Sequence, residues 1–314
     1  MKKLKPVKVA LVQVSPVFQN LEKSIIKLKE LLIEAKSNGA ELIVFGETWL
    51  CGYPSWLDHC PNVAIWDAPE VKEAFLEMYH NCLEAGGKEM QSIQELVGKL
   101  GVYVVLGANE SSSSGLGGKG TIYNSMFIIG PDGTIQNHHR KLMPTYTEKM
   151  LYGHGDGAGL KSVKSPFGNI TGAICWEHWM PLSRQALHQA GEHIHVALWP
   201  MVHERHELAS RHYAFEGRCF VLAVGQIMKA ADFPKGIELP PHLQKDSQIQ
   251  TLRGGSCVIG PDGNFILPPV FDKELIIYAE LDGNEVIKER MTLDVTGHYN
   301  RNDIFDFSIN DSRK

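Results

Sequence analysis

The chain has 314 residues, of which 43% are hydrophobic and 21% are charged, and its formal net charge is −5. This length and composition are typical of a soluble globular protein with one large α/β domain or two small ones, whose core needs no disulfides. The charge balance, with no long run of one sign, excludes an extended nucleic-acid surface, and no stretch approaches the roughly 18 apolar residues of a membrane span.

The first half of the chain predicts a β-α-β unit followed by further helices, a strand and a hairpin. Alternating apolar residues predict a strand over residues 7–15, and Asn20 begins an amphipathic helix that ends near residue 37. A short apolar strand over residues 41–47 completes the unit, which implies parallel strands. Farther along we expect a helical region over 69–100 with a break near Gly86, a strand over 102–108, and a hairpin made of 121–129 and 134–141.

The second half repeats this order. Strand and helix alternate over residues 169–175, 181–191, 194–199, 204–217 and 219–226, followed by a hairpin over 256–266, a strand over 275–281 and a helix over 285–291. Both hairpins turn on Gly-Pro-Asp-Gly, which favours two similar halves that share one core, but this sequence is also a favourable turn in its own right. Because no linker divides the chain, we predict one domain over residues 1–314 with a short tail from about 303.

Two patterns point to cofactor sites but lack the required context. Residues 115–120 fit the G-x-G-x-x-G pattern, yet they follow a serine run and precede a strand instead of a helix, so we expect a surface loop. The 14 histidines show no zinc-ligand spacing, and His-Glu-Arg-His at 203–206 departs from the H-E-x-x-H motif. We therefore predict no metal site.

Three predicted strand ends carry residues suited to catalysis. Cys175 follows an apolar strand, and a thiol at such a turn is well placed as a nucleophile if a neighbouring group takes its proton. Glu47 ends the strand over 41–47, where burial raises a carboxyl pKa and makes the group a usable base. Lys141 can hold its ammonium against a developing anion, with Glu148 seven residues on to orient it. Each of these residues also has an ordinary structural interpretation, and His178 is an alternative base for the thiol.

These segments resemble the catalytic blocks of the nitrilase superfamily, in its chain order Glu, Lys, Cys. The matching blocks are Phe-Gly-Glu-Thr at 45–48, Arg-Lys-Leu-Met-Pro-Thr at 140–145 and Cys-Trp-Glu-His at 175–178, with further matches at 152–157 and 297–299. The resemblance covers residues 7 to about 303 and implies an α/β fold, a four-layer αββα sandwich of two pseudo-symmetric halves.

The resemblance also implies how the site works. Glu47, Lys141 and Cys175 would meet as a triad, Glu148 would support the lysine, and neither a metal nor an organic cofactor would be needed. The implied reaction converts a small-molecule nitrile to the carboxylic acid and ammonia, through a thioimidate and then a thioester on Cys175. The implied assembly is a homo-oligomer, a dimer or larger, that pairs through a helical face.

Several other functions stay open. An amidase or carbamoylase would use the same triad on another substrate, as would a cyanide-hydrolysing relative. A Cys–His hydrolase would use His178 as its base, although the papain-type signature around the cysteine is missing. A non-catalytic binding protein on the same fold is a further alternative, which the intact triad positions disfavour.

Aromatic residues near the three blocks are candidates for the substrate pocket. We expect substrate-binding roles for Trp49, Tyr53, Tyr146, Trp176 and Trp199, and core packing is the alternative for each. If several of them line the pocket, an aryl or arylalkyl nitrile is the expected substrate.

The cysteines and the N-terminus predict the cellular location. Six scattered cysteines without a Cys-x-x-Cys motif favour free thiols in a reducing compartment. The apolar stretch near the N-terminus is too short and too interrupted for a signal peptide. We therefore expect a cytoplasmic protein without a nucleic-acid or membrane partner.

Overall fold

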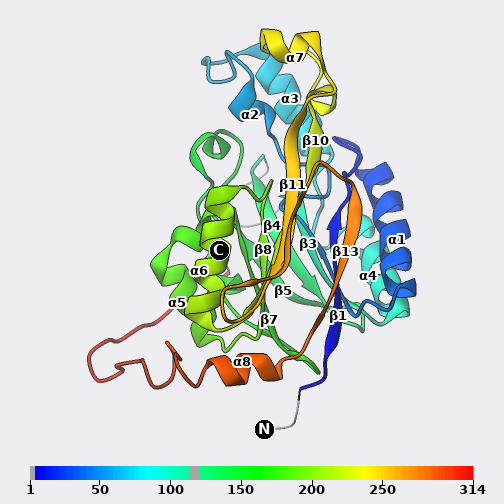
Figure 1. Cartoon of the computed structure of the whole chain (residues 1–314). Helices are drawn as coiled ribbons and strands as arrows, with labels where there is room; N and C mark the ends of the chain where they lie inside the picture. Colours follow the sequence, from blue (N-terminus) through cyan, green and yellow to red (C-terminus); the bar gives the residue numbers. More distant parts are fainter. Residues whose placement is uncertain (1–3, 113–119, 314) are drawn as a thin grey trace.

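A computed structural model of the chain describes residues 4–112 and 120–313. Most of the G-x-G-x-x-G match at 115–120 lies outside the described residues. Two mixed sheets lie face to face, and helices cover the outer face of each (Figure 1). Within the described residues, no helix is both long and apolar enough to cross a bilayer.

The first sheet has the strand order β13-β1-β2-β3-β4-β5. Its first three strands in the sequence pair in parallel, as the β-α-β pattern predicts, and the next two form an antiparallel hairpin. The strands are β1 (Val7–Gln13), β2 (Leu42–Phe45), β3 (Tyr103–Ser111), β4 (Ile122–Ile129), β5 (Ile135–Arg140) and β13 (Leu275–Leu281).

The second sheet repeats this plan with the order β10-β11-β9-β8-β7-β6, and β12 pairs with β11. Strands β7, β8 and β9 are parallel, and β11 and β12 form the hairpin. The strands are β6 (Val163–Ser165), β7 (Gly168–Ile174), β8 (Ile194–Leu198), β9 (Phe220–Val224), β10 (Ile227–Lys229), β11 (Gln250–Ile259) and β12 (Phe265–Phe271).

Amphipathic helices close the sandwich on both sides. Helices α1 (Leu21–Ser37) and α4 (Lys88–Leu100) bury apolar stripes against the first sheet, and Asn20 caps α1 through a 2.9 Å hydrogen bond from the Lys23 amide. Helices α5 (Pro181–Gln189) and α6 (Glu204–Gly217) cover the second sheet. The layers are therefore αββα, which confirms the fold that the resemblance implies.

Shorter helices lie at the two ends of the sheets. Figure 1 shows α2 (Trp56–His59), α3 (Pro69–His80) and α7 (Pro241–Lys245) together at one end, where their apolar side chains form a separate cluster, and α8 (Asn284–Glu289) at the other. Four 3₁₀ helices complete the elements of the described residues: η1 (Tyr146–Met150), η2 (Gly157–Gly159), η3 (Cys175–Trp179) and η4 (Ala230–Asp232). The sequence patterns did not predict α2, α7, β6 or β10, each of which has five residues or fewer.

The two Gly-Pro-Asp-Gly turns have the same geometry. Gly133 and Gly263 both have a φ of 79°, in the left-handed region that glycine enters without strain. In each turn the last glycine donates its amide to the carbonyl of the first, Gly130 and Gly260 respectively. The equivalent turns and the repeated strand order show two similar halves, and a single domain over the whole chain stays a prediction.

Strand β13 breaks this likeness between the halves. It follows the second half in the sequence, yet it pairs antiparallel with β1 in the first sheet, from Val7 opposite Leu281 to Gln13 opposite Leu275. The interface between the sheets then contains side chains of both halves in one cluster.

Candidate active site

The ends of three strands and the 3₁₀ helix η1 bring four titratable side chains together. Glu47 follows β2, Lys141 follows β5, Cys175 follows β7 as the first residue of η3, and Glu148 lies in η1. All four are buried. The Cys175 sulfur and one carboxylate oxygen each of Glu47 and Glu148 lie within 4.8 Å of one another. The structure therefore brings together the four residues that the sequence singles out for catalysis.

Lys141 lies at the centre of this group. Its Nζ donates to Glu47 Oε1 at 2.7 Å and to the two oxygens of Glu148 at 2.8 and 2.7 Å. Burial alone would lower the Lys141 pKa, but Cys175 in its thiolate form and the carboxylates of Glu47 and Glu148 raise it well above its usual range. Lys141 is thus an ammonium ion that donates hydrogen bonds to both carboxylates.

Glu47 has the properties of a general base. Burial is the largest influence on its pKa and raises it to about 7, although Lys141 and Asn124 favour the charged form. Its Oε1 accepts hydrogen bonds from Lys141 and, at 2.7 Å, from Asn124 Nδ2, whereas its buried Oε2 has no partner among the described residues. One carboxylate oxygen is therefore held in place and the other is available for a proton.

Cys175 needs such a base. Burial and the nearby carboxylate of Glu47 raise the pKa of its thiol well above the usual range, and Lys141 opposes them only in part. The thiol is thus protonated at neutral pH until a neighbour removes its proton. Cys175 has a φ of 54°, a left-handed conformation that is costly for a residue with a Cβ, and the Trp176 amide donates toward its sulfur.

Glu148 is fixed by groups outside the triad. The Tyr53 hydroxyl donates to its Oε1 at 2.8 Å, and the backbone amide of Thr145 donates to its Oε2 at 3.0 Å. Both oxygens also accept from Lys141, so Glu148 holds the ammonium at a set distance from Glu47.

His178 does not face the thiol. Its Nδ1 lies 2.6 Å from the backbone carbonyl oxygen of Cys175, and its Nε2 lies 2.9 Å from Nε2 of His195. Because a carbonyl oxygen only accepts, Nδ1 of His178 carries a proton. Burial lowers the His178 pKa to about 3, so the ring is neutral and its other nitrogen is occupied by His195. No ring nitrogen is left to act as the base for Cys175, which argues against a Cys–His hydrolase.

A cavity of about 300 Å³ opens above Cys175. Among the predicted aromatic residues, Tyr53, Tyr146 and Trp176 line it. Trp49 and Trp199 are not among the described residues that line this cavity. Both are fully buried, and their indole N–H groups donate to the Val14 carbonyl at 2.6 Å and to the Ser210 hydroxyl at 3.2 Å. The structure therefore assigns these two tryptophans to the core, where Trp199 stacks on His178.

The lining also contains residues that no sequence pattern indicated. Its wall combines apolar and polar side chains, and the residues not yet named are Ser55, Asp58, His59, Thr147, Pro200, Met201, His203, His206, Thr251 and Leu252. These positions lie in segments far apart in the chain, in α2, η1, α6, β11 and the loops beside them, so nothing in their local sequence links them to Cys175. Asn124 was missed for the same reason, since it lies within a buried strand.

Comparisons with known proteins agree with this geometry. The carbon-nitrogen hydrolase family matches residues 8–290. "Nitrilase 2" from an unknown prokaryotic organism is 35% identical over 96% of this chain and 92% of its own length. "Nitrilase" from Pseudomonas syringae pv. syringae is 36% identical over 95% and 88%. A crystal structure of a carbon-nitrogen hydrolase from Helicobacter pylori superposes with a TM-score of 0.69 at 20% identity, over 96% and 97% of the two chains, and supports the fold.

Proposed function

The chain belongs to the carbon-nitrogen hydrolase family and is thus a hydrolase of carbon–nitrogen bonds, and from this premise we propose that it is a nitrilase. Its substrate is an organic nitrile and its products are the carboxylic acid and ammonia. One observation carries the proposal: a buried thiol that lines a small cavity lies beside a carboxylate of raised pKa and a buried ammonium. The similarity to relatives that are named nitrilase supports the choice of a nitrile, instead of an amide, as the substrate of this chain.

The first step adds the thiol to the nitrile carbon. Glu47 Oε2 takes the proton from Cys175, the sulfur bonds to the nitrile carbon as one π bond of the C≡N group breaks, and Glu47 passes the proton to the nitrile nitrogen to give a neutral thioimidate. Lys141 and the Trp176 amide stabilise the charge that develops, and one such donor typically contributes about 3–4 kcal/mol. The ammonium needs no reorganisation because Glu148 already holds it.

The later steps use the same groups on water. Glu47 removes a proton from a water molecule that attacks the thioimidate carbon, and the tetrahedral intermediate expels ammonia to leave a thioester. A second water, activated in the same way, releases the carboxylic acid and restores the thiol. The covalent intermediate divides one slow hydrolysis into easier steps. An amidase or carbamoylase would enter at the tetrahedral stage, and cyanide would react as the smallest nitrile.

A substrate panel tests the proposal. We expect purified protein to release ammonia and acid from some aliphatic or aryl nitriles, and Cys175→Ala to release neither. Cys219→Ala is the matched control, because Cys219 is an equally buried free thiol in the core. Turnover of amides alone would favour the amidase alternative, and nitrile turnover by Cys175→Ala would rule out the covalent mechanism.

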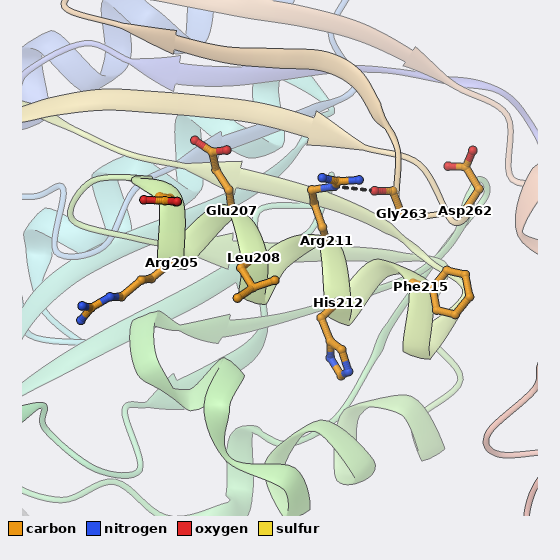
Figure 2. A pocket seen from close by; sticks show the side chains of 9 residues that line it. Arg205, Glu207, Leu208, Arg211, His212, Phe215, Asp262 and Gly263 are labelled. Atoms are coloured by element: carbon orange, nitrogen blue, oxygen red, sulfur yellow. Dashed lines mark hydrogen bonds between the residues drawn. The ribbon is translucent and has the colours of Figure 1, made fainter.

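We also propose that the protein pairs with a second copy through α6. One face of this helix and the β11–β12 turn line a groove of about 760 Å³, separate from the catalytic cavity (Figure 2). Leu208 and Phe215 are 62% and 47% exposed there, and charges of both signs surround them. A patch with both signs complements itself under two-fold symmetry. Sedimentation of Leu208→Glu against the native protein tests the pairing, and an unchanged mass would refute it.

We further propose a cytoplasmic location. Its support is that all six cysteines are free and buried, as expected of a protein in a reducing compartment. Fractionation of cells that express the tagged chain tests this location.

A further inference from the structure

The carboxylate of Glu177 contacts the backbone beside two catalytic residues. Its Oε2 accepts the amide of Ile174, which precedes Cys175, at 2.6 Å. Its Oε1 accepts the amide of Leu142, which follows Lys141, at 2.7 Å. The side chain is fully buried, and its two oxygens join chain segments that belong to different sheets.

Helix capping explains only one of these bonds. Glu177 is the third residue of η3, and a glutamate at that position commonly accepts the amide of the residue before the helix, as it does here with Ile174. The bond to Leu142 lies outside any capping pattern, because Leu142 is 35 positions away in the sequence. Capping alone therefore leaves the second oxygen unexplained.

The surroundings keep Glu177 ionised. Burial would raise its pKa, but His139 and the two amides lower it below its usual value. His139 Nε2 lies 3.0 Å from both oxygens and donates between them. His139 is two residues before Lys141, so Glu177 holds the chain on both sides of the lysine. A charged acceptor with three donors is a stiff connection, because such hydrogen bonds are shorter and stronger than neutral ones.

We propose that Glu177 is a positioning residue that sets the spacing between Lys141 and Cys175. It acts through the backbone on either side of these residues and does not touch the substrate. The inference rests on the proposed function, since it takes Lys141 and Cys175 to act in one step. Each sheet by itself fixes only one of them: β5 carries Lys141 and β7 carries Cys175. Glu177 bridges the two sheets at the point where the reaction occurs.

Two variants at this position test the proposal. Glu177→Gln keeps the shape, but its amide NH₂ cannot accept one of the two backbone hydrogen bonds. Glu177→Asp keeps the charge but is one carbon shorter, by about 1.5 Å, and so reaches only one of the two segments. For both we expect kcat to fall about 10²-fold, the effect of a misplacement of about 1 Å, with KM changed less than about threefold.

Glu110→Gln is the matched control. Glu110 is a buried carboxylate that accepts from Arg140 at 2.6 Å, from His138 at 2.8 Å and from Ser125, so its loss perturbs a comparable network. All of its partners lie in the first sheet, which means that it does not connect Lys141 to Cys175. We expect a similar drop in melting temperature and a loss of kcat at least about tenfold smaller.

A second measurement needs no substrate. The rate at which iodoacetamide alkylates Cys175, followed by peptide mass against pH, reports the thiolate in the folded protein. The midpoint of this dependence is the pH at which the alkylation rate reaches half its maximum. We expect it to rise by about 0.5 to 1 unit in the Glu177 variants, because the Lys141 ammonium moves away from the sulfur, and to stay the same in Glu110→Gln. If Cys175 of the native protein is alkylated normally but the protein turns over no nitrile, the proposed function is wrong. The alkylation measurement then still tests the positioning role of Glu177.

The possible outcomes separate cleanly. A kcat loss in the Glu177 variants that exceeds the control, together with the shifted midpoint, supports the proposal. Equal losses of kcat in Glu177→Gln and Glu110→Gln, or an unchanged midpoint, would overturn it. Failure of both Glu177 variants to give a cooperative melt would make Glu177 a folding residue, and that too would overturn the proposal.

Discussion

Replacing Glu47 by glutamine separates its catalytic role from its effect on stability. Glutamine has the shape of a protonated glutamate but cannot accept the proton of Cys175. A general base contributes about 10²–10⁴ to the rate, so we expect kcat of Glu47→Gln to fall by at least about 10²-fold. Lys141 keeps both hydrogen bonds to Glu148, so the rest of the site stays in place.

The stability of the same variant follows from the Glu47 pKa. Because the folded state raises this pKa from 4.5 to about 7, it binds the proton more tightly than the unfolded chain does. The free energy of unfolding therefore falls by about 1.4 kcal/mol per pH unit as the pH rises from about 4.5 to about 7, which is about 3 kcal/mol in total. Above that range it is constant. Glutamine never ionises, so the variant lacks this decline.

The side-chain amide of the glutamine, which lacks a hydrogen-bond partner, reduces the stability that the variant gains at high pH. The NH₂ of glutamine would occupy the place of Oε2, which has no partner among the described residues, at a cost of about 1–3 kcal/mol. We expect Glu47→Gln to be as stable as the native protein or up to about 2 kcal/mol more stable at pH 8, and less stable at pH 5. The difference between the two pH values, about 3 kcal/mol, is independent of the amide because that cost is the same at both.

Urea denaturation at pH 5 and pH 8, with nitrile turnover on the same samples, tests this reasoning. A variant that loses stability equally at both pH values would refute the assignment of a raised pKa to Glu47. Retention of more than about a tenth of the native kcat would refute its role as the base.

Three further predictions follow from the site. Lys141→Met should lower kcat by about 10²–10³-fold and the free energy of unfolding by about 3–5 kcal/mol at pH 8, since it leaves buried carboxylates without their cation; urea melts and turnover measure both. His178→Asn keeps a donor for the neighbouring carbonyl, so we expect its kcat to fall by less than the factor of about 10² that a general base supplies. A larger fall of kcat in a folded variant would restore the histidine as the base. Gly107→Ala would place a Cβ 2.1 Å from the carbonyl oxygen of Gly46, so we expect about 1–3 kcal/mol of destabilisation and reduced turnover, whereas Gly86→Ala, with no atom within 4 Å, should melt like the native protein.

Sequence patterns predict those parts of the fold that depend on local order. Hydrophobic alternation and helix caps located the long elements of both halves, except that the second hairpin, predicted over 256–266, extends from 250 to 271, and the position of Glu47 at the end of β2 followed from them. The pairing of β13 with β1 was not predictable, because no local pattern records which distant strand will be its neighbour. Very short elements such as β10 were missed because three residues carry no measurable periodicity.

The site shows the same limit. The block pattern named Glu47, Lys141 and Cys175, and the structure brings them together. The block pattern did not reveal which aromatic residues line the pocket and which pack in the core, since a tryptophan next to a catalytic block can point to either side of the chain. Trp176 lines the cavity and Trp199 lies beneath α6. The side of the backbone on which a ring lies depends on packing, which the residue type alone does not reveal.

The pairing of β13 with β1 also constrains how the protein reaches its native state on the ribosome. Strand β1 is synthesised long before β13, its partner in the first sheet, which ends at Leu281. Until that segment emerges, β1 is the edge of a sheet, with apolar residues and unpaired backbone groups, and such edges are prone to join other chains. The β1–β13 contacts form late and join segments far apart in the sequence, which is characteristic of slow folding. Nascent chains that stall before residue 275 should therefore depend on chaperones far more than completed ones.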